Sequence, residues 1–240
     1  MSIRLALLAA TLALGGCAHT RPDDPSDPLE PLNRAVFSFN RSADRYVLKP
    51  VAKAYDYSVP DPAKRGVSNF FNNLKEPRTI LNDLLQLKVK RAAKDTGRFL
   101  LNSTAGFAGL MDVATDAGLK RHDEDFGQTL GHYGVGPGWY LMLPLLGPST
   151  NRELVGFGGD YFTGVDYYLD SEDVVDSEGL LAAKAVDVVD TRARLFGADA
   201  LLDGALDPYI FLRTAYLQQR LAKVYDGNPP REMLYGVDDE

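Results

Sequence analysis

The chain has 240 residues, of which 45% are hydrophobic and 25% charged, and its formal net charge is −7. An acidic chain of this kind lacks the basic surface that nucleic-acid binding requires, so nucleic acid is excluded as a partner. Cys17 is the only cysteine, which rules out a disulfide within the chain. Stability must therefore come from a packed core or from contact with lipid.

The N-terminal segment has the three parts of a secretory signal peptide. Arg4 supplies the positive charge, and residues 5–14 form an apolar run. Two small residues, Gly15 and Gly16, precede the expected cleavage point. The apolar run of about ten residues is too short to span a bilayer, which needs about 20. We therefore predict a signal peptide over residues 1–16.

Cys17 follows Leu-Gly-Gly, an ending that resembles the lipobox of bacterial lipoproteins. The resemblance implies cleavage before Cys17 and acylation of its sulfur and of the new amine, which would anchor the protein to a membrane. The alternative is an ordinary signal peptide that leaves an unused thiol. Ala18 stands where an aspartate would favour the inner membrane, so the resemblance implies export to the outer membrane. Cleavage removes one arginine and moves the formal charge from −7 to −8.

Three further regions follow the signal peptide. Residues 17–28 carry the cysteine and are rich in proline and aspartate, which predicts a flexible, extended tether. Helical signals begin just after this segment and continue to Gly227, so one helical domain is predicted over 29–227. The Pro229-Pro230 pair then stops a helix, and residues 228–240 are predicted to form a variable tail.

Apolar residues at spacings of three and four predict amphipathic helices along most of the domain. The first stripe is predicted to end at Pro50, and a short second stripe is predicted to stop near Pro77. Asp207 and Pro208 are typical of a helix start, and Gly227 is typical of a residue that follows a helix end. No sustained alternation of period two is present, so we predict an all-α fold. The expected helices lie near 32–49, 67–76, 80–87, 89–100 and 208–224.

A segment rich in glycine and proline, residues 127–148, interrupts the helical pattern. It contains six glycines and three prolines, together with the apolar run 139–146. This run can be a buried loop or short helix of the core, or it can lie in lipid or face a lipid channel. Within the segment, Gly134, Gly136 and Gly138 are predicted to hold backbone angles or close approaches that a side chain would obstruct.

Two charged segments are candidates for chemical sites. His122 to Asp125 resembles a catalytic or metal cluster, but neighbouring residues point in different directions, so a charged surface loop with a helix cap at Asp125 is favoured. The acidic residues of 170–178 lack the spacing of a calcium loop and predict a solvated loop. Hydrolase and phosphate-binding motifs are missing from the sequence. We therefore predict no catalytic residues, no metal and no cofactor.

Several long strings, in order, resemble the MlaA family, whose members are also called VacJ lipoproteins. The resemblance runs from about Asp27 to Arg220 and is weaker over 153–206. The strings are DPLEPLNRAVFSFN (27–40), RYVLKPVAKAY (45–55), GVSNFFNNLKEP (66–77), GRFLLNSTAGFAGLMDVA (97–114), RHDEDFGQTLGHYGVGPGWYLMLPLLGPSTNR (121–152) and DPYIFLRTAYLQQR (207–220).

The resemblance implies a fold and a function. The expected fold is a ring of amphipathic helices embedded in one leaflet, with an amphipathic channel and no transmembrane span. The expected location is the inner leaflet of the Gram-negative outer membrane, on its periplasmic face and beside a trimeric porin. The protein would remove phospholipids that have strayed into the outer leaflet and pass them to a soluble periplasmic carrier. Two rivals are a structural scaffold lipoprotein and a membrane-bound hydrolase that uses His122 and Asp125.

Candidate site residues follow from this picture. Phe37 and Phe39 can face lipid but can equally serve helix packing. Arg152 and Lys184 can attract phosphate head groups, although a solvated surface position is favoured for both. Cys17 is the predicted lipid attachment site. The residues predicted to line a lipid channel or contact the membrane are Gly134, Gly136, Gly138, Trp139, Tyr140, Leu141, Leu143, Phe37 and Phe39.

Overall fold

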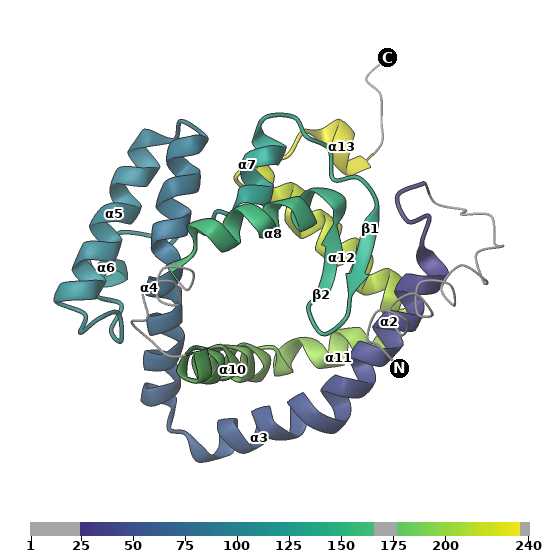
Figure 1. The fold of residues 1–240 in the computed structure, drawn as a ribbon, viewed down its shortest axis with the longest axis horizontal. Coiled ribbons are helices and arrows are strands. Elements are labelled where there is room, and N and C mark those ends of the chain that lie inside the picture. The colour runs from purple at the N-terminus through teal and green to yellow at the C-terminus, as the bar shows by residue number, and fades with distance from the viewer. Residues whose placement is uncertain (1–24, 166–176, 236–240) are drawn as a thin grey trace, which may run out of the picture.

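The computed structural model describes residues 25–165 and 177–235, and these are mostly helical. Helices and one β-hairpin are arranged around a ring, and α10 packs against the inner side of α3 (Figure 1). Within the described ranges, no helix is both long and apolar enough to cross a membrane. The elements are α2 (Glu30–Ala43), the π-helical turn η1 (Asp44–Leu48), α3 (Lys49–Ser58), α4 (Asp61–Leu85), α5 (Val89–Thr104), α6 (Val113–Asp116), α7 (Phe126–His132), β1 (Tyr140–Leu143), β2 (Gly147–Thr150), α8 (Asn151–Thr163), α10 (Ser177–Arg194), α11 (Phe196–Gly204), α12 (Pro208–Val224) and α13 (Arg231–Tyr235).

The predicted helix end at Pro50 is wrong. Helical backbone continues from α2 through η1 into α3, and the chain curves along the edge of the ring (Figure 1). Proline lacks an N–H and its ring clashes with the carbonyl four residues earlier in a regular α-helix. Here Lys49 donates to the carbonyl of Asp44, five residues back, so a π turn stands directly before the proline. The wider turn lets the helix bend instead of stopping.

The predicted stop near Pro77 is also wrong, because α4 passes through this proline without a break. Two expected helices therefore form one. Glu76, the residue before the proline, is buried and accepts a hydrogen bond from Arg98 Nε of α5 at 3.0 Å. Packing against α5 thus outweighs the local preference of a proline. The helices predicted over 89–100 and 208–224 are confirmed as α5 and α12, and Asp207 caps α12 through the N–H groups of Tyr209 and Ile210.

The expectation of a mostly helical fold is confirmed, but it missed a short hairpin in the segment 127–148. β1 pairs with β2 in antiparallel register, with Tyr140 opposite Thr150 and Leu143 opposite Gly147. Alternation is present, since Tyr140 and Met142 are buried while the two leucines between and after them are half-buried. Strands of four residues are too short for this alternation to stand out in the sequence.

Two asparagines on α2 bind the free edge of β1. Asn33 Nδ2 donates to the carbonyl of Tyr140 at 3.0 Å, and its Oδ1 accepts from the N–H of Met142 at 2.9 Å. Asn40, seven residues later, repeats the pattern with the carbonyl of Leu143 and the N–H of Leu145. The two amides therefore take the place of a third strand and cover backbone groups that would otherwise be unpaired.

We expect Asn33→Ala to lower the free energy of unfolding by about 2–4 kcal/mol, because it leaves buried backbone groups of β1 without partners. Asn40→Ala is the matched control, since its partners lie toward the more exposed turn and its effect should be smaller. Denaturant unfolding in detergent measures both. Equal effects of the two variants would contradict the role given to the buried amide.

The apolar core is small and lies between α2, the hairpin and α12. It consists of Phe37, Tyr140, Met142 and Tyr209, and the ring of Tyr209 meets those of Phe37 and Tyr140 edge-on. Asp27 closes it from the N-terminal side, accepting hydrogen bonds from Tyr209 Oη at 2.5 Å and Arg213 Nη1 at 2.8 Å.

These contacts show how far the described fold extends at its two ends. Asp27 is buried, and the carbonyl of Ser26 accepts from the N–H of Tyr140 at 2.7 Å, so these two residues pack against the helical domain. At the other end, α13 forms within the predicted tail. Neither short segment shows a hydrophobic period that would have placed it in the fold.

Candidate functional site

The interface between α4 and α5 is polar. The side chains that these two helices bury are carboxylates, amides, hydroxyls and one guanidinium, with few apolar groups among them. At its centre Arg98 is held by Glu76 at 3.0 Å and by Asp112 at 2.6 Å. Burial raises the pKa of Glu76 to about 7, although Arg98 acts in the opposite direction. The buried polar residues of the pair are Asn73, Glu76, Thr79, Asn82, Asp83, Asp95, Arg98 and Asn102.

The exterior is correspondingly apolar. On α8, Val155 is 63% exposed and Phe162 is 60% exposed, and at the hairpin turn Leu145 is 72% exposed. Further exposed large apolar side chains occur on most other helices, including Val89 and Leu100 of α5. Exposed large apolar side chains in this number are unusual for a protein surrounded by water and suit contact with lipid.

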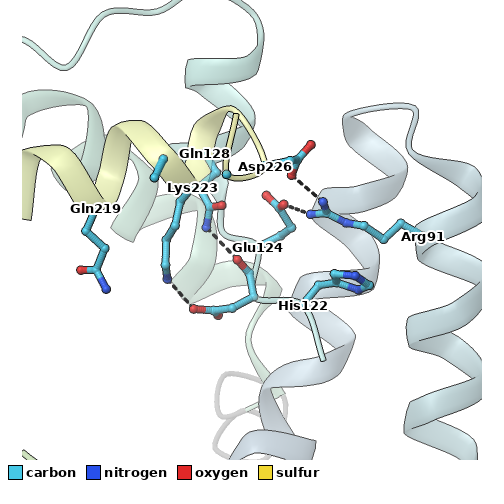
Figure 2. Close-up of a pocket in the computed structure, with 10 residues that line it drawn as sticks. Arg91, His122, Glu124, Gln128, Gln219, Lys223 and Asp226 are labelled. Carbon is cyan, nitrogen blue, oxygen red and sulfur yellow. Dashed lines mark hydrogen bonds and ion pairs between the residues drawn. The ribbon is translucent and has the colours of Figure 1, made fainter. Parts of the chain in front are cut away.

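The segment His122 to Asp125, predicted as a charged surface loop, is built into a network of ion pairs in which Glu124 is buried. Glu124 is only 2% exposed and is held by Arg91, which also pairs with Asp226 at 2.5 Å (Figure 2). Asp125 caps α7 by accepting from the N–H of Gln128 at 2.8 Å, which confirms the predicted cap.

The network bears on the hydrolase alternative. His122 Nδ1 lies 2.8 Å from Asp95 Oδ1, whereas Asp125 is engaged by both guanidinium nitrogens of Arg220, at 2.7 and 2.8 Å. The two residues therefore bind different partners and not each other. Among the described residues, no group of three or more potential ligands is placed to hold a metal ion.

Arg152 is buried, so the solvated surface position favoured for it is wrong. Its Nη2 lies 2.8 Å from Glu153 Oε1, and Glu153 also pairs with Arg220. Burial acts to lower the pKa of Arg220, but the hydrogen bonds and the charge of Asp125 outweigh this effect and raise the pKa above its usual value. This cluster joins α7, α8 and α12. Lys184 lies exposed on α10.

A pocket of about 480 Å³, here called the loop pocket, lies between the glycine-rich loop and α12. Its walls are largely apolar, with two arginines among the lining residues. Four predicted candidates therefore meet in one place. The pocket is lined by Gly134, Gly136, Gly138 and Arg152 from the predicted set, and by Arg220, Leu217, Leu221, Val224, Tyr225 and Met233 among others.

The other predicted contact residues lie elsewhere. Phe37 and Tyr140 belong to the core, which for Phe37 is the helix-packing alternative. Trp139 and Phe39 are each about half exposed, at 51% and 55%. Leu141 and Leu143 are half-buried on the face of the hairpin opposite Tyr140 and Met142. Cys17 lies outside the described residues, as do positions 170–176 of the predicted acidic loop.

The three glycines of the loop differ in what they require. Gly134 and Gly138 have φ angles of +86° and +69°, in the region that favours glycine. A Cβ at Gly138 would also lie 2.7 Å from Asn151 Oδ1, which accepts from the N–H of Trp139. Gly136 has neither constraint, because its φ lies outside the left-handed region and a Cβ added there would meet no atom within 4 Å. The prediction is wrong for Gly136 and holds for the other two.

We expect Gly138→Ala to destabilise the protein by about 1–3 kcal/mol, because alanine in the left-handed region is strained and its Cβ would displace Asn151. Gly136→Ala is the control and should unfold like the wild type. Thermal unfolding followed by the fluorescence of Trp139, the only tryptophan, reads the loop directly. A destabilised Gly136→Ala paired with an unaffected Gly138→Ala would contradict this assignment.

Known proteins share this organisation. Residues 25–223 match the MlaA lipoprotein family. The chain belongs to the MlaA family. It is 40% identical over 226 residues to the intermembrane phospholipid transport system lipoprotein MlaA of Escherichia coli strain K12, with 91% of this chain and 88% of that protein covered. It is 37% identical over 233 residues to the protein of the same name from Haemophilus influenzae, with 94% and 91% covered.

A solved structure supports the fold. One chain from a study of the structural basis for maintenance of bacterial outer membrane lipid asymmetry superposes on this protein with a TM-score of 0.73. The two chains are 40% identical, and the match covers 85% of this chain and 100% of that chain. The arrangement of helices is therefore that of an MlaA-family protein. Sequence reasoning missed Arg220 and Met233 of the loop pocket, although the stripe through Leu217, Leu221 and Val224 already marked one face of α12.

Proposed function

We propose that this MlaA-family protein moves phospholipids between the outer membrane and a soluble periplasmic carrier, and so maintains lipid asymmetry. The observation that carries the proposal is the inverted polarity of the fold, with ion pairs buried and apolar side chains exposed. The apolar outer surface of such a ring is suited to contact with lipid, and its polar interior is suited to form a path for a head group.

In detail, the protein is an acylated lipoprotein held through Cys17 on the periplasmic face of the outer membrane, where it lies in the inner leaflet beside a trimeric porin. It takes misplaced phospholipid from the outer leaflet and releases it to the carrier. The groups that we propose for contact with lipid are the predicted candidates that line the loop pocket, together with the half-exposed side chains of Trp139 and Phe39. Transport breaks no covalent bond, so no catalytic residue or cofactor is needed.

The proposal is tested by phospholipid exposure in cells that lack the protein. A membrane-impermeant, amine-reactive reagent should label more aminophospholipid on these cells than on the parent, and the intact gene should restore the parental value. A scaffold lipoprotein predicts unchanged labelling while envelope attachment is lost. Purified protein that accelerates lipid exchange between vesicles would support transport, and inert protein with unchanged labelling would favour the scaffold.

Lipidation is tested separately. We expect Cys17→Ala to leave an uncleaved or mislocalised precursor without fatty-acid label, because the acceptor sulfur is missing. Metabolic labelling with a fatty acid and fractionation of the membranes measure the two effects. Normal label and normal outer-membrane recovery of this variant would contradict lipidation at Cys17. Some membrane association should persist through the exposed apolar surface, so the label is the sharper measurement.

A further inference from the structure

Helices α5 and α6 form an arm on the outer side of α4, away from the hairpin and α12 (Figure 1). This segment, residues 89–116, is here called the α5–α6 arm. Within the described ranges, α5 packs mainly against α4 and against α6 of the same arm. The arm is therefore held to the ring largely through the polar interface between α4 and α5. An element attached through few apolar contacts can open locally while the rest of the protein stays folded.

Polar contacts join the arm to α4 along the whole interface. Each of them pairs a side chain of α4 with a group of the arm. In order along α4, they are Asn69 Nδ2 with the carbonyl of Leu110 (3.2 Å), Asn73 Nδ2 with Ser103 Oγ (3.0 Å), Glu76 Oε1 with Arg98 Nε (3.0 Å) and Asp83 Oδ1 with Arg91 Nε (2.8 Å). The arm is thus held by hydrogen bonds and charge, so a change of protonation within the interface acts on it directly.

Two carboxyl groups meet inside this interface. Asp83 of α4 and Asp95 of α5 are fully buried, and their side chains are in hydrogen-bond contact with each other. Two ionised carboxylates have no hydrogen to place between them, so this contact requires a shared proton. On their other sides, Asp83 Oδ1 accepts from Arg91 Nε, and Asp95 Oδ1 lies 2.8 Å from His122 Nδ1. Burial raises the pKa of Asp83 to about 6, and the hydrogen bond with Asp95 acts in the same direction.

Negative charge is in excess around the two carboxyls. Among the described residues, no N–H or O–H group donates to Asp83 Oδ2 or to Glu76 Oε2, and both oxygens are buried. The cluster, which joins these groups directly or through a common partner, contains six carboxyls, four cations and one imidazole, some of them drawn in Figure 2. They are Glu76, Asp83, Asp95, Asp112, Glu124 and Asp226; Lys88, Arg91, Arg98 and Arg121; and His122. A bound proton removes one uncompensated charge, whereas two adjacent buried carboxylates repel each other.

We propose that a proton shared by Asp83 and Asp95 controls whether the α5–α6 arm is docked against α4. With the proton in place, the two carboxyls bond to each other and the arm stays docked. Without it, the two carboxylates repel each other, and the arm moves away from α4 until water reaches them. The arm carries exposed apolar side chains at its tip, so its release also moves an apolar surface. These side chains are Phe107, Leu110 and Met111.

The direction of the pH dependence follows from where the proton binds more tightly. The pKa of Asp83 is about 6 in the docked arm, against an ordinary value of 3.8 in water. Docking is therefore strongest below about pH 4 and weakens as the pH rises through about 6. Between pH 5 and pH 7, this one proton raises the equilibrium constant for release about tenfold. Glu76 of the same interface acts in the same direction, because burial raises its pKa to about 7.

Native-state hydrogen exchange of the full-length protein in a nonionic detergent tests the proposal. The amides of α5 are the probes and those of α12 are the reference, at pH 5 and pH 7, with rates corrected for the intrinsic effect of pH. We expect α5 to exchange faster than α12 at pH 7. Its exchange should depend little on low concentrations of urea, because release exposes much less surface than unfolding does. The opening constant of α5 should rise at least tenfold from pH 5 to pH 7.

Asp83→Asn isolates the shared proton. The new amide can donate to Asp95 without a proton from solvent, and its oxygen can still accept from Arg91, so the rise between pH 5 and pH 7 should shrink about tenfold. Asp95→Asn should have the same effect, and it provides the test if Asp83→Asn folds poorly. Asp116→Asn removes an exposed carboxyl of α6, and this matched control should behave as the wild type does.

Three results would overturn the proposal. One is exchange of α5 and α12 with the same opening constant and the same urea dependence, because the arm would then open only with the whole fold. The second is an opening constant of α5 that does not change between pH 5 and pH 7. The third is a pH dependence of both asparagine variants equal to that of the wild type. None of these results bears on the proposed function, which is tested by surface phospholipid in cells that lack the protein.

Discussion

Replacement of Arg220 by alanine should lower the free energy of unfolding by about 3–5 kcal/mol, a large part of the roughly 5–15 kcal/mol that stabilises a typical domain. The guanidinium binds Asp125 through two nitrogens, at 2.7 and 2.8 Å, and also pairs with Glu153. Its loss leaves two largely buried carboxylates, of which only Glu153 keeps another cation, Arg152. Chemical unfolding in detergent, together with the amount of folded protein recovered, measures the effect.

Arg41→Ala is the control for the loss of one arginine. Arg41 pairs with Asp203 at 2.6 Å, and about half of the Asp203 side chain is exposed to solvent. The expected loss in the free energy of unfolding is therefore below about 1 kcal/mol. A double-mutant cycle makes the test sharper. Glu153→Gln should cost less in the Arg220→Ala background than in the wild type, because the carboxylate has already lost a partner. Additive effects, or an Arg220→Ala variant as stable as Arg41→Ala, would show that the cluster is not a main source of stability.

The helices could be predicted because their signals are local. Spacings of three and four marked α5 and α12, and Asp207 with Pro208 marked the start of α12. The two prolines misled the prediction because what overrides them is not local. Pro50 is accommodated by the π turn before it, and Pro77 by the packing of Glu76 against α5.

The direction in which each helix faces could not be predicted. Periodicity shows that a helix has an apolar stripe and a polar stripe, but the same pattern fits a helix with either stripe turned inward. On α5 the buried positions are mainly polar, at Asp95, Arg98 and Asn102, while Leu100 is exposed. If the protein is assumed to be surrounded by water, the apolar face of α5 is assigned to the interior and the polar face to the surface, which is the reverse of the observed arrangement. Only the resemblance to the family suggested lipid outside.

The candidate sites divide in the same way. The glycines of the loop pocket were found because glycine and proline restrict backbone geometry locally, and Gly138 shows that constraint in its φ angle. The buried position of Arg152 and the edge contacts of Asn33 depend on partners far away in the sequence. No spacing rule could have connected Asn33 with Tyr140, 107 residues later.

Stability should fall as the pH rises from about 5 to about 8, because burial gives several acids a raised pKa in the folded state. The pKa of Glu76 is raised to about 7, and burial also raises those of Asp83 and Asp160 to about 6. The folded state binds these protons more tightly than the unfolded chain does, so protonation stabilises it. This stabilisation is fully present below the pKa of the unfolded chain, near 4.5 for Glu76, and is lost as the pH rises through the pKa of the folded state. Carboxyls with lowered pKa, such as Asp112 at about 2, act only below about pH 4.

Glu76→Gln isolates the largest of these contributions. The amide keeps an oxygen for Arg98 Nε but cannot ionise, so the loss of stability between pH 5 and pH 8 should shrink by about 2–3 kcal/mol relative to the wild type. Urea unfolding at a series of pH values, followed by the fluorescence of Trp139, measures the slopes. A wild-type protein that grows more stable between pH 5 and pH 7 would contradict the sign of the effect. Parallel slopes for the two proteins would show that Glu76 stays ionised in its ion pair with Arg98 between pH 5 and pH 8. The polar interface of α4 and α5 would then contain a charged ion pair throughout this range.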